Sequence, residues 1–299
     1  MWKAILPAVI ALVTLGLSLV SGEAFKRENE QKPQVVALAQ PAAEPAKAKA
    51  ADPVTTATIP HPTGGHPVAL VIGNATYPDA GFPLAQPVNN ARALAAALKD
   101  KGFDVELGEN LTKQAMEQAF ETFKSKIEPG SPALIFFSGI GVQAGRQTYM
   151  MPINAHVWSE ADVRRTGLSL EPLLNEIDAI GAGAKVVILD ASRRNPFERR
   201  FRSGSAGLAA IQAPDDTLVI SAAAPGKVVS DGEDDVSPFM DELIGQIRTS
   251  GQSAEAVFKR TRLAVSQASH RQQVPWVSSS LVEDFSFAQP GAKAQQSAR

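Results

Sequence analysis

The feature that most constrains the fold of this chain is a series of short apolar runs that alternate with amphipathic segments. The runs are too short for buried helices, and several end at glycine, serine or aspartate, as strands in the middle of a sheet do. Between them, apolar residues recur at the spacing of helices that cover a sheet. The predicted strands are 68–72, 103–107, 133–137, 185–190 and 217–222, with a hairpin at 141–151 and an edge strand at 282–287, and the predicted helices are 89–101, 112–127, 170–180, 238–248 and 254–268.

This alternation predicts how the strands are connected. Strands that alternate with helices form a mostly parallel sheet, and the connecting helices cover both of its faces. We therefore expect an α/β fold, a three-layer α/β/α sandwich whose central sheet has about six strands. Functional side chains in such a sheet gather beyond the carboxyl ends of its strands, which here are residues 73–74, 138–141 and 190–192.

The first 66 residues differ in composition from the predicted folded body. Lys3, an uncharged apolar run and small residues up to Ala24 make residues 1–24 a predicted secretory signal, with an uncleaved N-terminal membrane anchor as the alternative. Residues 25–66 are rich in Ala, Pro, Lys, Glu and Gln, which predicts a disordered linker. We expect the folded domain at 67–288, a flexible tail at 289–299, and a periplasmic or secreted protein that an uncleaved anchor would tether to the inner membrane.

Composition excludes several classes of function. The chain has no cysteine, which removes disulfides, thiolate metal sites and thiol catalysis. Its four histidines show no zinc-ligand spacing, so we expect neither a metal nor another cofactor. A formal net charge of -2 argues against nucleic acid as a partner, because nucleic-acid-binding domains normally carry a basic excess.

The segments at two of the strand ends resemble those of bacterial metacaspase-type, caspase-like peptidases. Residues 136–143 read FFSGIGVQ where that family has FYSGHGVQ or a similar segment, and residues 189–197 read LDASRRNPF where it has LDACRDNPF. The segments ALVIGN, PVNNAR, YMMP, AAPG, SPF and QVPW follow in the family's order, so the resemblance covers about 67–287. It implies a caspase-like fold and the activity of a cysteine-type endopeptidase.

The same motifs depart from the family at the catalytic positions. In that family a cysteine thiolate attacks the scissile carbonyl, a histidine moves protons, and backbone amides stabilise the oxyanion. The histidine position is Ile140 here and the cysteine position is Ser192, while Gly139 and Gly141 fall where the oxyanion donors are expected. Isoleucine carries no proton to exchange, and a serine hydroxyl without a base is a poor nucleophile. The resemblance therefore predicts that the dyad does not function.

A different residue could in principle replace the missing base. His156 follows the predicted hairpin and His270 follows a late helix, so neither lies at a predicted strand end. A lysine could serve as in Ser-Lys hydrolases, but no lysine falls within either motif.

The predicted substrate-binding positions are also altered. Family members that cleave after Arg or Lys use acidic residues to neutralise that side chain, and Ser138 and Asp190 match two of these positions. Two further aspartates of the motifs are replaced by Asn90 and Arg194, so a cationic substrate would meet a weaker or reversed field. An alternative for Asp190 is a structural role, as an acceptor of hydrogen bonds at the strand end.

Basic residues crowd the loop after Ser192, with only Glu198 opposing them. Three interpretations stay open: a solvated loop, a docking patch for an acidic protein segment or an anionic cell-envelope polymer, and internal pairing with the acidic loop 231–235. The basic residues are Arg193, Arg194, Arg199, Arg200 and Arg202.

Three functional hypotheses follow from these observations. The first is an exported pseudoenzyme that binds peptides or partner proteins on a caspase-like scaffold without cleaving them. The second is an active endopeptidase or other hydrolase that uses Ser192 as an atypical nucleophile. The third is a tethered structural or regulatory module of the cell envelope, such as a decoy partner of an active paralogue.

Overall fold

The structure is a computed structural model of the chain, and it describes residues 65–81, 83–200, 206–230, 232, 234–249, 251–282 and 284–287. The predicted signal or anchor at 1–24, most of the predicted linker at 25–66 and the predicted tail at 289–299 lie outside these residues. Within the described part of the chain, no helix is long and apolar enough to cross a membrane.

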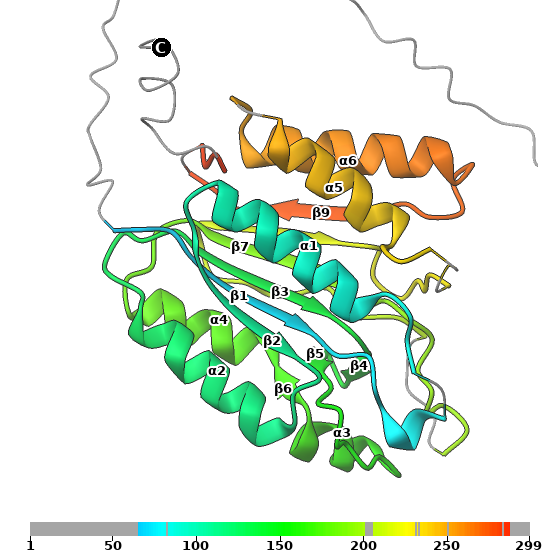
Figure 1. Cartoon of the computed structure of the whole chain (residues 1–299). Coiled ribbons are helices and arrows are strands. Elements are labelled where there is room, and N and C mark those ends of the chain that lie inside the picture. The colour runs from blue at the N-terminus through cyan, green and yellow to red at the C-terminus, as the bar shows by residue number, and fades with distance from the viewer. Residues whose placement is uncertain are drawn as a thin grey trace, which may run out of the picture. The chain divides into compact units, whose positions relative to one another are not determined.

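A six-stranded sheet forms the centre of the domain (Figure 1). Its first five strands are parallel and its last strand, which runs antiparallel to its neighbour, closes one edge. The predicted α/β fold with a mostly parallel sheet of about six strands is therefore confirmed. In spatial order the strands are β2 (Asp104–Glu109), β1 (Val68–Gly73), β3 (Ala133–Ser138), β7 (Lys185–Asp190), β8 (Thr217–Ser221) and β9 (Trp276–Ser279).

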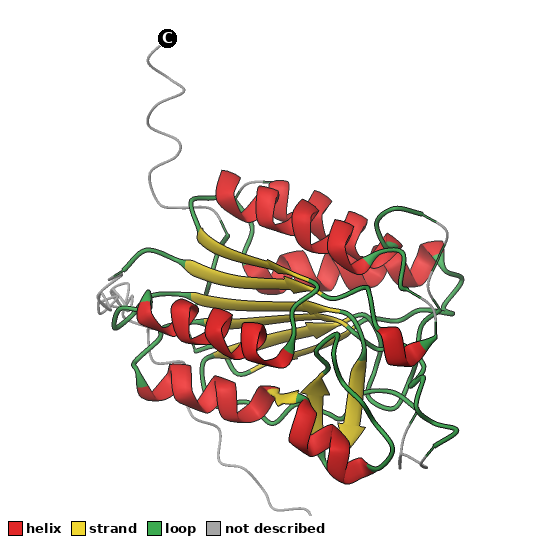
Figure 2. Cartoon of the chain, turned by 60° about the horizontal axis from the view of Figure 1, so that its bottom comes forward, coloured by secondary structure: helices red, strands yellow, loops and turns green. Residues whose placement is uncertain are grey.

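Helices cover both faces of this sheet, as the views of Figures 1 and 2 show. Side chains alternate between the faces along each strand, so Ala69 and Val71 of β1 pack in one core and Val68 and Leu70 in the other. Every predicted helix is present, and each begins and ends within three residues of its predicted bounds. The first face is covered by α1 (Pro87–Asp100), α5 (Pro238–Arg248) and α6 (Ala254–Ala268), and the second by α2 (Lys113–Ser125) and α4 (Leu170–Ala179).

A small antiparallel sheet follows the third central strand. It contains β4 (Gly141–Ala144), β5 (Gln147–Met150) and β6 (Leu168–Ser169), and its first two strands are the predicted hairpin. Between β5 and β6 lies α3 (Glu160–Thr166), a helix that the sequence analysis did not predict. Its signal is the Ser159 and Asp162 pair, which forms a capping box in which each side chain bonds the backbone of the other residue. The short helical turn Pro78–Ala80 was likewise not predicted.

The predicted edge strand at 282–287 is wrong, because the edge strand is β9. The only pairing found in the described part of 282–287 is an isolated bridge between Ser286 and Ser253. Phe285 and Phe287 instead turn into the core, where the Phe287 ring lies 6.5 Å from that of Phe103 and 6.2 Å from that of Phe258, measured between centroids. Apolar residues at every second position are typical of a strand. Here Phe285 and Phe287 follow that spacing because both pack in the core, although their segment forms no strand.

We expect the Phe287→Ala variant to lose about 3–5 kcal/mol of unfolding free energy, because it leaves a cavity among packed aromatic rings. Val282→Ala, in the same segment but at a side chain that is 83% exposed, should change that free energy by less than about 0.5 kcal/mol. Urea denaturation of both variants measures the difference. Equal effects at the two positions would contradict the packing described for this segment.

Candidate functional site

The register of the central sheet brings the predicted strand ends together. Gly73 of β1 pairs with Ser138 of β3, and Ser138 pairs with Asp190 of β7. Residues directly opposite each other on neighbouring strands place their side chains on the same face. Ser138 and Asp190 therefore both face α1 and α5, at the sheet edge where α/β proteins place their functional groups.

The buried Asp190 carboxylate is the centre of a polar cluster at this edge. Its Oδ2 atom accepts hydrogen bonds from Asn90 Nδ2 at 2.7 Å, Ser138 Oγ at 3.1 Å and Ser237 Oγ at 3.3 Å. Asn90 lies in the first turns of α1, and Ser237 is the residue that caps α5. The backbone N–H of Ser237 donates in turn to Asn90 Oδ1 at 2.9 Å. Three of the four predicted substrate-binding residues thus meet, and they bond to one another.

Arg193 completes the cluster from within the chain. Its guanidinium is buried, with Nη2 3.4 Å from Asp190 Oδ2 and Nη1 donating to the carbonyl oxygens of Gly139, at 3.2 Å, and of Asp190. A buried carboxylate without a cation is costly, and a guanidinium within hydrogen-bond distance compensates it. The positive charge beside Asp190 therefore belongs to the chain itself.

Arg194, the fourth predicted substrate-binding residue, lies elsewhere. Its side chain is 77% exposed and makes two hydrogen bonds to Glu198, at 2.7 and 2.9 Å. The structure does not bring Arg194 to the Asp190 cluster. The field at Asp190 is set by Arg193, which precedes Arg194 and whose side chain turns inward.

Arg200, farther along the same loop, is held by neighbours that the sequence analysis did not assign to it. Its guanidinium bonds both carboxylate oxygens of Asp79, at 2.5 and 3.1 Å, and lies 4.4 Å from the centroid of the Trp158 ring. The hydrogen bonds from Arg200 hold the pKa of Asp79 below its usual range. Through Arg200 the loop therefore contacts two other segments of the chain, at Asp79 and at Trp158.

The basic loop as a whole is therefore only partly free to bind a partner. Arg199 is exposed, and Arg202 lies outside the described residues. The ion pairs that the structure describes for the loop join its arginines to Asp190, Glu198 and Asp79. The predicted acidic partner, 231–235, includes Asp231 and Glu233, which are outside the described residues, so that prediction stays untested.

Ile140, at the histidine position of the motif, is enclosed in apolar surroundings. Its side chain is 2% exposed and packs in a cluster with Tyr77, Met151 and Phe197. The backbone N–H of Ile140 donates to the Tyr77 hydroxyl at 3.0 Å, and that hydroxyl donates to the Met151 carbonyl at 3.1 Å. Burial raises the pKa of the Tyr77 hydroxyl. The neutral Tyr77 hydroxyl therefore holds the backbone of this loop in place through these two hydrogen bonds.

Ser192, at the cysteine position, is as deeply buried as Ile140. It is 1% exposed, and its Oγ atom has no hydrogen-bond partner among the described residues. Its backbone carbonyl accepts a hydrogen bond from Val229 N at 2.8 Å, so the segment after β8 covers it. No base within the described residues holds this hydroxyl, and a hydroxyl without one is a weak nucleophile.

The backbone amides of the two glycines beside Ile140 are engaged within the fold. Gly139 N donates to the Asp190 carbonyl at 3.4 Å, and Gly141 N donates to the Ala191 carbonyl at 3.2 Å. Both positions need glycine, since a Cβ at 139 would lie 2.5 Å from the Tyr77 hydroxyl and one at 141 would lie 2.9 Å from the backbone oxygen of Ala191. The predicted oxyanion donors thus point at the end of β7 and the residue after it.

The two histidines considered as replacement bases are both exposed. His156 is exposed on its loop, and His270 follows the end of α6. Within the described residues, no three histidine, aspartate or glutamate side chains form a group that could hold a metal ion.

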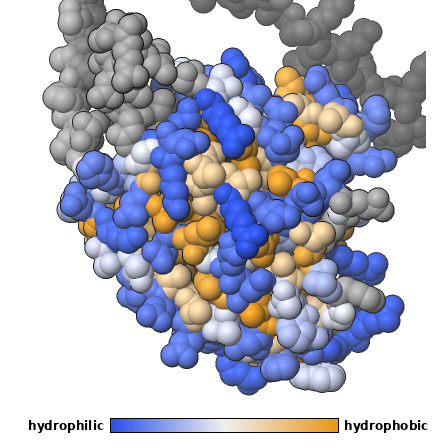
Figure 3. Space-filling view, viewed as in Figure 1, coloured by the Kyte–Doolittle hydropathy of each residue, from blue (hydrophilic) through white to orange (hydrophobic). Residues whose placement is uncertain are grey.

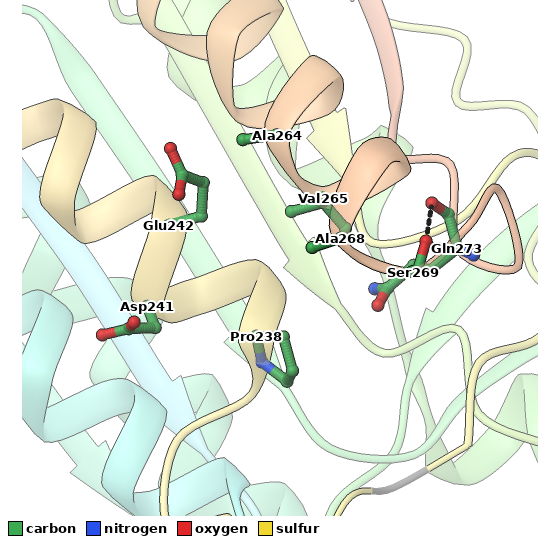
Figure 4. Close-up of a pocket in the computed structure, with 8 residues that line it drawn as sticks. All are labelled: Pro238, Asp241, Glu242, Ala264, Val265, Ala268, Ser269 and Gln273. Carbon is green, nitrogen blue, oxygen red and sulfur yellow. Dashed lines mark hydrogen bonds between the residues drawn. The ribbon is translucent and has the colours of Figure 1, made fainter.

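A hollow of about 360 Å³ lies between α5 and α6 (Figure 4). Two of its polar side chains are engaged within the fold: Glu242 accepts from the Gln246 side chain at 2.7 Å, and the Ser269 hydroxyl bonds the backbone of Gln273. On the face shown in Figure 3, hydrophobic residues lie in patches among hydrophilic ones. The hollow is lined by Pro238, Asp241, Glu242, Ala264, Val265, Ala268, Ser269 and Gln273.

Sequence reasoning missed three residues of the site. Tyr77 carried no recognised signal, although a tyrosine four residues after a strand end is within reach of the neighbouring loop. Arg193 was counted as part of a surface patch, and Ser237 was noted only as part of a matching motif. A helix-capping serine directly before Pro238 was the signal that could have placed Ser237 at the sheet edge.

We expect Tyr77→Phe to lower the unfolding free energy by about 2 kcal/mol at pH 7, because it leaves the Ile140 N–H and the Met151 carbonyl buried without their partner. Since burial raises the pKa of Tyr77, its contribution is complete below about pH 10, where unfolded tyrosine ionises, and is lost as the pH rises further. The gap between variant and wild type should therefore narrow above pH 10. Urea denaturation at pH 7 and pH 11 measures it.

The matched control for this prediction is Tyr149→Phe, which removes the other tyrosine of the chain. The hydroxyl of Tyr149 donates to the side chain of Gln147 rather than to a buried backbone group. Its loss should cost about 0.5–1 kcal/mol at pH 7. A cost at Tyr77 no larger than this would contradict the role given to its hydroxyl.

Comparison with known proteins bears on the whole folded body. A search among curated proteins finds no match. The family model for the caspase domain matches residues 66–286, which is well over half of the chain and includes every strand end described above. The chain therefore belongs to the caspase-domain peptidase family.

Proposed function

We propose that this caspase-domain protein does not cleave peptides and serves as an exported protein- or peptide-binding module. The observation that carries the proposal is the environment of Ile140 and Ser192, the two positions that the motifs align with the catalytic histidine and cysteine. Ile140 fills an apolar cluster, and the Ser192 hydroxyl is buried without a hydrogen-bond partner in the described residues.

Covalent catalysis by Ser192 needs a base within hydrogen-bond reach and donors aimed at the developing oxyanion. The polar cluster at the same sheet edge is centred on Asp190, whose Oδ2 atom already accepts hydrogen bonds from several donors. The amides of Gly139 and Gly141 are bonded to carbonyl oxygens. These contacts support the proposal that the residues at the positions of the family's reaction centre here serve packing and hydrogen bonding within the fold.

The binding role rests on the retained fold. The polar cluster, the capped helices and the two tightly packed glycines keep the sheet edge ordered, and an ordered surface loses less entropy when a partner binds. Export rests on the sequence pattern of residues 1–24. The tethered decoy and the Ser192-dependent hydrolase stay as alternatives, and the cleavage assay below separates the hydrolase from the binding module.

The full chain should cleave fluorogenic peptides with Arg or Lys at the cleavage position no faster than its Ser192→Ala variant does. A covalent serine-hydrolase probe should leave Ser192 unlabelled, because the hydroxyl is buried and has no base. Cleavage that disappears in Ser192→Ala, together with labelling of Ser192, would establish the hydrolase instead.

The binding role predicts that displayed peptides enriched on the wild-type chain share a sequence pattern. The same pattern should be recovered on the Ser192→Ala variant, since binding does not depend on the hydroxyl, and it should vanish on the heat-unfolded chain. Failure of any pattern to emerge from the folded chain would count against peptide binding.

Restoring the catalytic residue types should not by itself restore catalysis. We expect Ile140→His combined with Ser192→Cys to show no strong Arg-directed cleavage in the same peptide assay. A histidine at 140 would lie in apolar surroundings that disfavour its charged form, and Asn90 would still stand where the family has an aspartate. Robust cleavage by this double variant would show that only the two side chains separate the protein from an active peptidase.

A further inference from the structure

The outward side of α6 carries a cluster of exposed cations around an exposed leucine. Lys259, Arg260 and Arg262 are exposed, whereas the residues on the opposite side of the helix are buried against the core. Residues three and four apart lie on the same face of a helix, so Lys259 and Arg260 both lie one turn before Leu263. Leu263 is itself 58% exposed. We call these four residues the α6 face.

The positive charge of the α6 face is not neutralised by ion pairs. Among the described residues, none of its three cations has an ion-pair partner. Glu255, the acidic residue of α6, instead accepts a hydrogen bond from the Ser279 hydroxyl of β9. By contrast, every lysine and arginine of α2 and α3 is paired with a glutamate or aspartate. The α6 face is therefore a local excess of positive charge on a chain whose formal net charge is -2.

The surroundings of the α6 face favour a flat anionic partner over a narrow one. α6 packs against α5 and β9 and turns its other side outward (Figure 1). The hollow between α5 and α6 is lined by Asp241 and Glu242, so an acidic peptide segment lying in it would meet like charge. The cations of the α6 face lie instead on the convex outer surface of the helix. Such a surface can rest on an extended layer of negative charge without entering a groove.

We propose that the α6 face binds the surface of an anionic phospholipid membrane. Each lysine or arginine near such a surface is attracted to the headgroup phosphates, and an exposed leucine between them adds apolar contact at the acyl boundary. The sequence pattern of residues 1–24, which predicts a secretory signal or an anchor, agrees with a protein that meets a membrane. The inference goes beyond the proposed function, because α6 supplies none of the residues described at the Asp190 cluster.

A fluorescent label placed one turn after Leu263 tests the contact. The chain has no cysteine, so a single introduced cysteine can be labelled with a polarity-sensitive dye. In the full chain, the label on Gln267→Cys should shift to the blue with vesicles of phosphatidylcholine and phosphatidylglycerol in equal parts, and not with phosphatidylcholine alone. The shift should shrink as salt is added, because salt screens exposed charges. A label on Gln118→Cys, at an exposed glutamine of α2, should not shift.

Removing the cations should remove the contact. In the Gln267→Cys background, Lys259→Ala, Arg260→Ala and Arg262→Ala together should weaken it about a hundredfold, at about five-fold for each cation. The shift should then almost vanish at the lipid concentration that half-saturates the parent. All variants keep residues 1–24, so any contribution of that segment to vesicle binding is common to them.

The matched control removes the same charge elsewhere. Arg146, Arg199 and Lys227 are exposed, lie outside α6 and have no ion-pair partner among the described residues. Their joint replacement by alanine in the Gln267→Cys background should leave the shift nearly unchanged. Circular dichroism checks that both triple variants are folded, as expected for substitutions at exposed positions.

The proposal is overturned if the label at Gln267 does not shift with anionic vesicles, or if it shifts equally with neutral ones. It is also overturned if the label at Gln118 shifts as much, or if the control variant loses the shift as fully as the α6 variant. A shift with polyglutamate and none with vesicles would assign the α6 face to an acidic protein instead. None of these measurements reads cleavage or peptide binding, so their outcome is separate from that of the proposed function.

Discussion

At the carboxyl end of β7, one carboxylate oxygen of Asp190 accepts hydrogen bonds from side chains that belong to α1, β3 and the cap of α5. The cost of burying a charged group forces each of these segments into place, because any donor that moved away would leave the carboxylate less compensated. Arg193 adds the opposite charge from the loop after β7. The order of the sheet edge, and the path of the chain over it, depend on this cluster.

The arrangement also explains how the fold accommodates Ile140 and Ser192 at the carboxyl ends of β3 and β7. An isoleucine gains stability by packing with Tyr77 and Phe197, where an ionisable side chain would need water or a partner. The loop keeps its shape because the Tyr77 hydroxyl bonds the Ile140 amide. Ser192 is buried as well, and its backbone carbonyl accepts a hydrogen bond from the Val229 amide.

Much of the fold was predictable because it depends on local pattern. Runs such as 68–72 and 133–137 are apolar throughout, since both faces of a parallel sheet are covered. The helices are predicted by the spacing of their apolar residues and by the capping residues at their ends. The errors have equally physical causes. Phe285 and Phe287 imitate a strand because alternate side chains enter one core, and α3 is so short that its capping box was its main signal.

The sequence by itself determined the fold class, the position of the strand ends and the residue types at the site, because periodicity and motif order are properties of the chain. Only the tertiary structure decided what those residues do. Asn90, Ser138 and Asp190 bond to one another, Arg193 turns inward, and Arg194 faces solvent beside Glu198. Charge and spacing alone do not show which of two adjacent arginines turns inward, and the two differ here because one of them lies within reach of a buried carboxylate and the other does not.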